Sequence, residues 1–335
     1  MAVVVCLTVD TEHSMGGAWA DRNLRPVSTE RRIYCKIKGV DNGIGWICNQ
    51  LKLHGLRATF FCEVFNALVF GMDDAKGWIE FLIEQGQDVQ LHTHLNYYYY
   101  AHEQLQNMPN PSRTDDLAAL PPSLRRCILG QAIELFSNLS GKFPTAYRAG
   151  NWQASRSLIA DLANAGIRLD SSFNPAAKGS GSFDREDLQP NTLQIVEGVR
   201  ELPLTVARQS LPGRSVLKPL DLVSLSRWEI RKVLDDAEML GLTHVTFVLH
   251  SFSTVKAADV QYERMRRNRI VQRRTTFLIE YLAQNKERFR VATCTDIANE
   301  PDSILLKSQP VIPSLGFLRP FARTLTQAAN SMFWV

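Results

Sequence analysis

The feature that most constrains the fold is a regular alternation of short β-branched or apolar runs with longer segments of helical period. Glycines follow several of the helical segments, at the position where helices often end. Strands that alternate with helices form parallel sheets, because each helix returns the chain to the same edge of the sheet. The predicted strands are residues 3–9, 58–62, 88–92, 145–148, 166–170, 199–206, 244–250 and 290–294.

Between these runs lie segments of helical period, and this many strand–helix units can close a sheet into a barrel. A chain of 335 residues with 45% hydrophobic composition can bury such a core. We therefore expect one α/β domain, a distorted (β/α)7-type barrel, over residues 1–300, with a C-terminal extension at 301–335. The predicted helices are residues 40–53, 74–84, 122–139, 155–165, 227–240 and 261–286.

Composition and charge exclude several classes of protein. The formal net charge of +4 is too small to indicate a nucleic-acid-binding protein. The first ten residues lack a basic leader and a small-residue cleavage site, so they favour a buried strand over a secretion signal. The six cysteines contain no C-x-x-C pair, which favours reduced thiols over disulfides or a zinc finger. We expect a cytoplasmic protein.

Polar side chains capable of catalysis recur where the predicted strands end. The carboxyl ends of parallel strands meet at one edge of the sheet, and α/β enzymes build their sites there. A chance distribution would not select that single edge, so the pattern indicates an enzyme. The side chains are Asp10, Glu12, His92, His94, Arg148, Asp170 and His250.

Glu12, His92 and His94 form a donor set for a metal ion. A spacing of two in an extended segment places both side chains on the same face, which applies to the histidine pair and to Asp10 with Glu12. Two imidazoles and a carboxylate suit one divalent ion, for which we expect Zn²⁺. An isolated H-x-H pair is more often a structural, hydrogen-bonded pair. The carboxylates at an equivalent strand end favour the metal site.

Hydrolysis at such a centre requires two proton transfers by side chains. Asp10 suits the general base, and His250, at the end of an apolar strand, suits the acid that protonates a leaving amine. Arg148 is predicted to hold Asp10 ionised through a charge-assisted hydrogen bond. The alternative for a lone arginine at a strand end is a structural salt bridge. The sequence also leaves open whether Asp10 is the base or a metal ligand.

Taken in order, these motifs resemble those of the polysaccharide deacetylase family, the NodB-homology carbohydrate esterases. The resemblance covers roughly residues 1–300, and an ordered set is far more specific than a single motif. It implies a distorted barrel, a divalent metal, usually zinc, and hydrolysis of N- or O-acetyl groups on carbohydrates. The similar segments are residues 7–12, 58–61, 88–94, 147–152, 170–172 and 248–250.

Two positions depart from the family pattern. The common first motif has two adjacent aspartates, and Thr11 stands in place of the second, which binds metal in the family. We therefore assign the ligand role to Glu12. The usual second histidine falls four residues after the first, where this chain has Asn96, so His94 is predicted as its substitute.

Three further residues are predicted to bind the substrate: Tyr97, Trp152 and Asp170. Tyr97 opens a run of four tyrosines that either buries alternate rings in a strand or, in a loop, stacks on sugars. Trp152 has the same two interpretations, and Asp170 begins the segment similar to the family's fourth motif. The arginine-rich segment 264–274 favours a solvated surface, with a diphosphate contact as the alternative.

The predicted function is removal of an N-acetyl or N-formyl group from an amino sugar, an activated or lipid-linked intermediate of cell-surface glycan synthesis. One alternative is an amide hydrolase that acts on a small non-sugar substrate. Another is a catalytically inactive carbohydrate-binding barrel.

The end of the chain, residues 315–335, carries a stripe of apolar residues at helical spacing, with Arg319 and Arg323 beside it. Such a helix either packs on the barrel or lies in the headgroup region of a membrane, and the second interpretation predicts peripheral contact with the inner membrane face.

Overall fold

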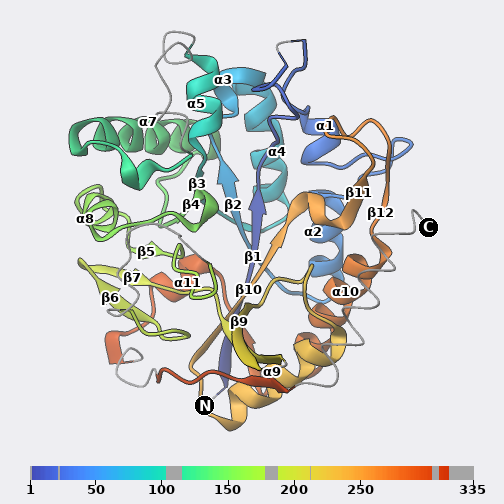
Figure 1. The fold of residues 1–335 in the computed structure, drawn as a ribbon, viewed down its shortest axis with the longest axis vertical. Helices are drawn as coiled ribbons and strands as arrows, with labels where there is room; N and C mark the ends of the chain where they lie inside the picture. The colour runs from blue at the N-terminus through green and yellow to red at the C-terminus, as the bar shows by residue number, and fades with distance from the viewer. Residues whose placement is uncertain are drawn as a thin grey trace.

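A curled sheet that includes β1 (Val3–Thr11) forms the centre of the fold, with helices around it (Figure 1). The structure is a computed structural model that describes residues 2–21, 23–102, 115–177, 188–211, 213–303 and 309–316. Within these residues the sheet order is β10-β1-β2-β3-β4-β5-β7-β6, and β13 also pairs with β1. This arrangement confirms the predicted distorted (β/α)7-type barrel.

All pairings in this sheet are parallel except that of β6 with β7. Between β7 and β10 the sheet is continued by backbone hydrogen bonds, from Thr205 N to Thr246 O (3.3 Å) and from Leu222 N to Val248 O (3.1 Å). The strands besides β1 are β2 (Thr59–Glu63), β3 (Asp88–Thr93), β4 (Ala146–Ala149), β5 (Leu169–Asp170), β6 (Gln194–Val196), β7 (Val199–Glu201), β10 (His244–His250) and β13 (Phe289–Val291).

The six predicted helices are all present and cover the outside of the sheet (Figure 1). Ser226 and Glu229 form a capping box at the start of α9, and Gly141 ends α7 in the left-handed conformation that glycine adopts readily. These helices are α2 (Ile44–Leu53), α4 (Met72–Glu84), α7 (Pro122–Ser140), α8 (Arg156–Asn164), α9 (Arg227–Met239) and α10 (Arg269–Gln284).

Short elements connect these units at the ends of the strands. Thr293 and Asp296 form a second capping box, which starts α11 and ends the predicted strand at 290–294 early. The short helices are α1 (Thr29–Arg32), α3 (Ala67–Phe70), α5 (Leu95–Ala101), α11 (Cys294–Ala298), and the 3-10 turns η1 (Leu117–Ala119), η2 (Gly150–Trp152) and η3 (Ser251–Thr254).

Three further predictions differ from the structure. The strand at 199–206 is two strands, because Pro203 has no N–H to continue a ladder. The helix at 261–286 begins only at Arg269, because Asn268 caps it and the preceding residues form the hairpin of β11 (Val255–Ala257) and β12 (Met265–Arg267). The four tyrosines lie in neither a strand nor a loop but in helix α5, which buries the first three.

The first part of the C-terminal extension packs on the barrel. Strand β14 (Ser314–Gly316) joins β8 (Val206–Leu211) and β9 (Arg214–Pro219) in a three-stranded sheet. Leu315 of β14 is buried in the main core. The predicted amphipathic helix, with Arg319 and Arg323, lies outside the described residues.

Five of the six cysteines are buried free thiols, and only Cys127 is exposed. Within the described residues, the helices lack the length and apolar character needed to span a membrane.

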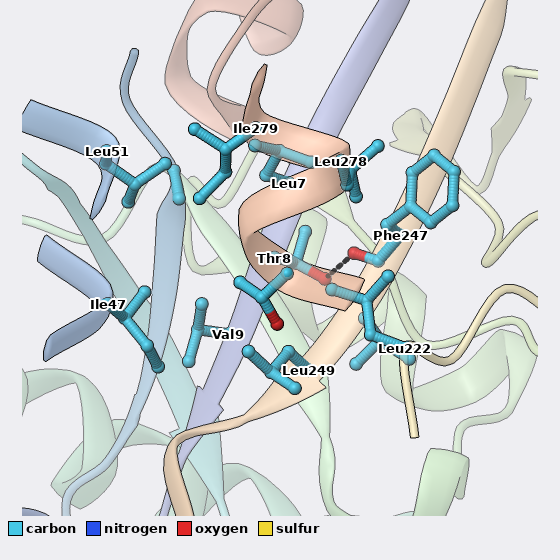
Figure 2. Close-up of a pocket in the computed structure, with 13 residues that line it drawn as sticks. Leu7, Thr8, Val9, Ile47, Leu51, Leu222, Phe247, Leu249, Leu278 and Ile279 are labelled. Atoms are coloured by element: carbon cyan, nitrogen blue, oxygen red, sulfur yellow. Dashed lines mark hydrogen bonds between the residues drawn. The ribbon is translucent and has the colours of Figure 1, made fainter. Parts of the chain in front are cut away.

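Apolar side chains fill the space between the sheet and its outer helices, as Figure 2 shows for β1, β10, α2 and α10. Leu278 and Ile279 of α10 lie over Leu7 and Phe247, with Leu51 of α2 beside them. The packing leaves a cavity of only about 20 Å³. This contact holds α10 on the barrel and is expected to make a large contribution to stability.

Leu278→Ala should lower the free energy of unfolding by about 2–5 kcal/mol, because it enlarges an apolar cavity in the core. Chemical denaturation monitored by circular dichroism measures the change. Met239→Ala, which truncates a side chain that is 75% exposed at the end of α9, is the matched control and should have little effect. Equal losses in the two variants would contradict the packing described.

Candidate metal centre and active site

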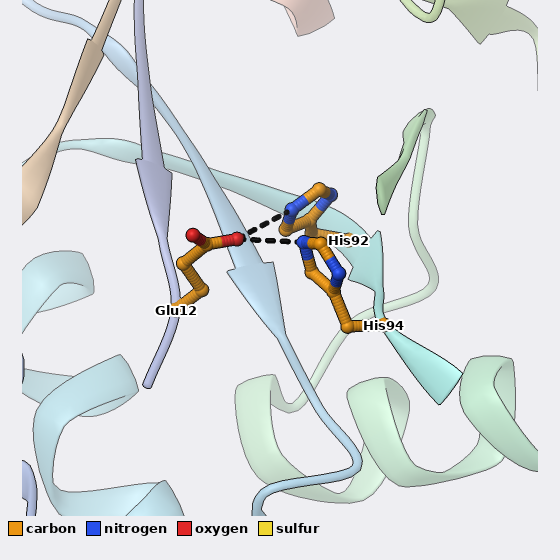
Figure 3. Close-up of side chains that lie close together, drawn as sticks. All are labelled: Glu12, His92 and His94. Atoms are coloured by element: carbon orange, nitrogen blue, oxygen red, sulfur yellow. Dashed lines mark hydrogen bonds and ion pairs between the residues drawn. The ribbon is translucent and has the colours of Figure 1, made fainter. Parts of the chain in front are cut away.

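The structure brings Glu12, His92 and His94 together at the carboxyl edge of the sheet (Figure 3). One donor atom from each side chain lies within 4.8 Å of the others. Glu12 Oε2 is 2.7 Å from His94 Nε2 and 3.4 Å from His92 Nε2. Donor atoms bound to one zinc ion at ~2.0–2.2 Å lie roughly 3.3 Å apart in a tetrahedron, so this set fits a single ion with little movement.

Both histidines are oriented by hydrogen bonds from their other ring nitrogen. His92 Nδ1 donates to the backbone carbonyl of Arg148 at 2.8 Å, and His94 Nδ1 donates to the carboxylate of Asp115. Each contact leaves the Nε2 atom facing Glu12, where a metal ion could take the place of a proton. Gly150 leaves room for the His94 ring, since a Cβ there would lie 2.6 Å from His94 Nδ1.

Asp115 is a residue of the site that the sequence did not predict. It lies in the segment before η1, 21 residues after His94, and Asn151 Nδ2 donates to the same carboxylate oxygen at 2.8 Å. No strand-end position or spacing marks this residue. The only signal in the sequence was that an acidic residue follows the histidine motif within about 20 positions.

Glu12 and His94 shift each other's pKa in the direction that favours the charged form of each side chain. Burial disfavours the charged form of Glu12, but His94 and the hydrogen bonds from both histidines outweigh it and hold the pKa of Glu12 well below its ordinary value. Burial acts against charge on His94 as well, yet Asp115 and Glu12 together raise the pKa of His94 well above its ordinary value. A cation is therefore favoured between these side chains, and a bound metal would replace the proton on His94.

Asp10, Arg148 and His250 meet beside this cluster. Arg148 Nη1 donates to Asp10 Oδ1 at 2.6 Å, and both side chains are buried. Asp10 Oδ2 lies 3.9 Å from His250 Nε2, which is too far for a hydrogen bond. The second oxygen of Asp10 and the ring of His250 are thus adjacent, with His250 30% exposed.

Arg148 is held by neighbours on several strands. It donates to Thr8 Oγ1 at 2.9 Å and to the carbonyl and hydroxyl oxygens of Ser171 at 3.0 and 2.9 Å. Its guanidinium lies over the rings of Phe61 and Trp152, with Cζ–centroid distances of 4.1 and 4.9 Å. Trp152, predicted to bind substrate, therefore packs on Arg148, and it is half-buried with a positive φ of 60°.

A cavity of about 360 Å³ opens beside the metal cluster. Glu12 and His94 line one part of it, and Tyr97 lines it too although that side chain is only 2% exposed. Trp19 and Arg32 are also in the lining. Arg32 stacks on Phe252, donates to the hydroxyl of Tyr262, and lies 3.8 Å from Glu12 Oε1.

Asp170 lies beneath the site rather than in its wall. It is fully buried, accepts a hydrogen bond from Ser172 Oγ at 2.7 Å, and lies beside the buried carboxyl group of Glu201. Burial is the main cause that raises the pKa of both carboxyl groups, and the nearby Asp170 raises that of Glu201 further. The protonated forms of the two carboxyl groups are thereby favoured, and direct contact of the buried Asp170 with a substrate would require its neighbours to move.

Removing the Asp115 carboxylate should weaken metal binding about 10- to 100-fold while the protein stays folded, because His94 loses the partner that orients it. Asp115→Ala is the test, with zinc affinity measured by competition with a chromophoric chelator. Asp116→Asn keeps the cap of η1 and does not touch His94, so it should bind zinc like the unchanged protein. An Asp115→Ala variant with unchanged affinity would show that this contact does not orient the ligand.

The buried acid pair predicts a pH dependence of stability. The folded state favours the protonated pair, so its contribution is present below the ordinary pKa of Glu201, 4.5, and is lost as the pH rises through the raised value. Glu201→Gln cannot ionise, so its free energy of unfolding should fall less steeply from about pH 5 to 8. Urea titrations across this range measure the slope, with the exposed Glu197→Gln as control. An unchanged slope in Glu201→Gln would contradict the raised pKa of Glu201.

The comparisons with known proteins bear on the fold. No family model and no curated protein matches the sequence. The structure is similar to that of a candidate polysaccharide deacetylase from Mycobacterium smegmatis, with a TM-score of 0.57, 16% identity and 92% of each chain covered.

Two other solved structures are similar at lower scores. A family 4 carbohydrate esterase from Streptomyces lividans has a TM-score of 0.42 and 11% identity, covering 93% of this chain and 98% of that one. A CE4 family pseudoenzyme from Bacillus anthracis has a TM-score of 0.44 and 9% identity, covering 89% and 66%. The fold assignment rests on the Mycobacterium structure, and this chain has the fold of a polysaccharide deacetylase.

Proposed function

We propose that this protein is a metal-dependent hydrolase that removes an N-acetyl or N-formyl group from an amino sugar. The observation that carries the proposal is the position of a Glu12, His92 and His94 donor set beside a buried Asp10–Arg148 pair and His250, all at one edge of the sheet. These groups supply a Lewis acid site, a base and an acid, which amide hydrolysis needs together.

Glu12, His92 and His94 would hold the metal, and the two imidazoles and one carboxylate fit Zn²⁺. Such an ion would polarise an acyl carbonyl and lower the pKa of a bound water. Hydrogen bonds hold both histidines in position. His92 Nδ1 donates to the backbone carbonyl of Arg148, and His94 Nδ1 donates to the carboxylate of Asp115.

Asp10 suits the role of general base. One of its carboxylate oxygens accepts a hydrogen bond from Arg148, which fixes its rotamer, and the other lies 3.9 Å from His250 Nε2. That free oxygen accepts the proton of the attacking water. Arg148 is a positioning residue here, since its remaining hydrogen bonds go to Thr8 and Ser171 inside the barrel.

His250 suits the general acid. Its Nε2 lies 3.9 Å from Asp10 Oδ2, so the two groups can face the same tetrahedral carbon from neighbouring positions without bonding to each other. When protonated, His250 donates its proton to the amine nitrogen as the C–N bond breaks. The proton that Asp10 took from water then returns to His250, which restores both groups.

The substrate assignment is supported by the cavity beside the cluster. A volume of about 360 Å³ lies within the range of small-ligand pockets, and Trp19 offers an aromatic face in its lining. The Mycobacterium protein of the same fold is described as a polysaccharide deacetylase, which favours a carbohydrate. Arg32 adds a positive charge to the lining, which suits the phosphate of an activated or lipid-linked sugar.

Asp10→Asn should retain the metal yet lose on the order of a hundredfold or more in kcat, because the proton acceptor is gone. His250→Ala should show a similar loss. Acetate or formate release from N-acylated amino sugars measures the rate, and atomic absorption measures the metal.

His54→Ala, at the C-cap of α2, is the control and should keep full activity. Loss of metal from Asp10→Asn would instead make Asp10 a ligand. Full activity of the unchanged protein after complete chelation of metal would refute the proposed function.

A further inference from the structure

A second cavity, of about 420 Å³, lies among the outer helices α2, α9 and α10. It shares no lining residue with the cavity beside the metal cluster. Its side chains come from the first residue of α9 and from α2 and α10, and Figure 1 shows α2 and α10 next to each other on one side of the barrel. The proposed reaction uses none of them.

Three arginines dominate the lining: Arg227, Arg269 and Arg273. Within the described part of the chain, no carboxylate is recorded in an ion pair with any of them. Arg227 and Arg269 are the first residues of α9 and α10, where the helix dipole already places partial positive charge. The first turn of α10 has no acidic residue to offset this charge, so an anion bound here would be stabilised.

The amide side chains of the lining add further donors. Gln50 Oε1 accepts a hydrogen bond from Thr276 Oγ1 at 2.9 Å, so the amide of Gln50 presents its NH₂ group as the remaining donor. Gln272 Nε2 is buried and has no partner among the described residues. Glu280 is the single acidic group of the lining. The site is therefore rich in donors and poor in acceptors, which matches an oxygen-rich anion.

The walls of this cavity are held in place. Buried Arg274 donates to the carbonyls of Val223 and Leu222 at 2.6 and 3.4 Å, which ties α10 to the turn that leads into α9. Asn268 Nδ2 donates to Ser253 O at 3.1 Å, which fixes the start of α10. The arginines thus project from a rigid frame, as a preorganised binding site requires.

We propose that this cavity binds a phosphate-bearing ligand at a site separate from the reaction centre. Arg227, Arg269 and Arg273 contact the phosphate oxygens, and Trp46 provides an aromatic face for the organic group attached to them. The same chemistry is presented by a soluble phosphate ester and by the phosphate headgroup of a lipid.

The test is titration calorimetry of the full-length protein with inorganic pyrophosphate at low salt. We expect saturable binding that weakens as the salt concentration rises, and a loss of affinity on the order of tenfold or more in Arg269→Ala and in Arg273→Ala. Arg273→Lys keeps the charge but not the planar fork, so it should bind with intermediate affinity. Arg126→Ala, which removes an exposed arginine of α7, is the matched control and should bind like the unchanged protein.

Glu12→Ala separates this site from the metal centre, since pyrophosphate also binds metal ions. Affinity that is retained in Glu12→Ala and lost in the arginine variants supports the proposal. Absence of binding, or equal binding in the arginine variants that remain folded by circular dichroism, overturns it.

Co-sedimentation with vesicles of phosphatidylcholine containing phosphatidic acid distinguishes the two sources of phosphate. Sedimentation that depends on Arg269 and Arg273 assigns the site to a lipid headgroup, and pyrophosphate binding without sedimentation assigns it to a soluble phosphate ester. Failure of the proposed deacylation would leave each of these outcomes unchanged, because they are measured without turnover.

Discussion

The buried pair of Arg148 and Asp10 is the interaction on which the rest of the site depends. Arg148 extends from β4 across the interior of the barrel to β1, and its other donors reach Thr8 and Ser171. Thr8 in turn donates to Phe247 O of β10, and Ser171 donates to Leu202 O after β7. The guanidinium of Arg148 therefore links β4 to β1 and to Ser171, which follows β5. Loss of either Arg148 or Asp10 would leave the other charge buried without its partner.

The metal cluster is built on the same strand ends, so the two parts of the site are positioned together. The backbone carbonyl of Arg148 orients His92, while its side chain orients Asp10. Parallel pairing of β3 with β4 places His92 opposite Arg148 in the register. The proposed metal ligand His92 and Arg148, which positions the proposed base, are therefore register partners. A shift of register between β3 and β4 would displace both at once.

Charged side chains are paired inside the barrel, whereas several arginines gather on its outer surface. Within the barrel each described charge of the site has a partner, such as Asp10 with Arg148 and His94 with Asp115. Arg227, Arg269 and Arg273 line the outer cavity. None of them forms an ion pair with a carboxylate of the described residues. Exposed arginines tolerate this arrangement because water solvates them, and the arrangement leaves them available to an anion.

The sequence by itself determined the strand–helix alternation, the edge of the sheet that carries the reactive residues, and the shared face of His92 and His94. These follow from local periodicity, because a spacing of two in a strand and the direction of parallel strands are set without knowledge of distant contacts. Tertiary structure alone decided that Asp115 orients His94, that Asp170 is buried against Glu201, and that the tyrosines after His94 form a helix. Each of these depends on residues far apart in the chain or on burial, and neither leaves a periodic signal in the sequence.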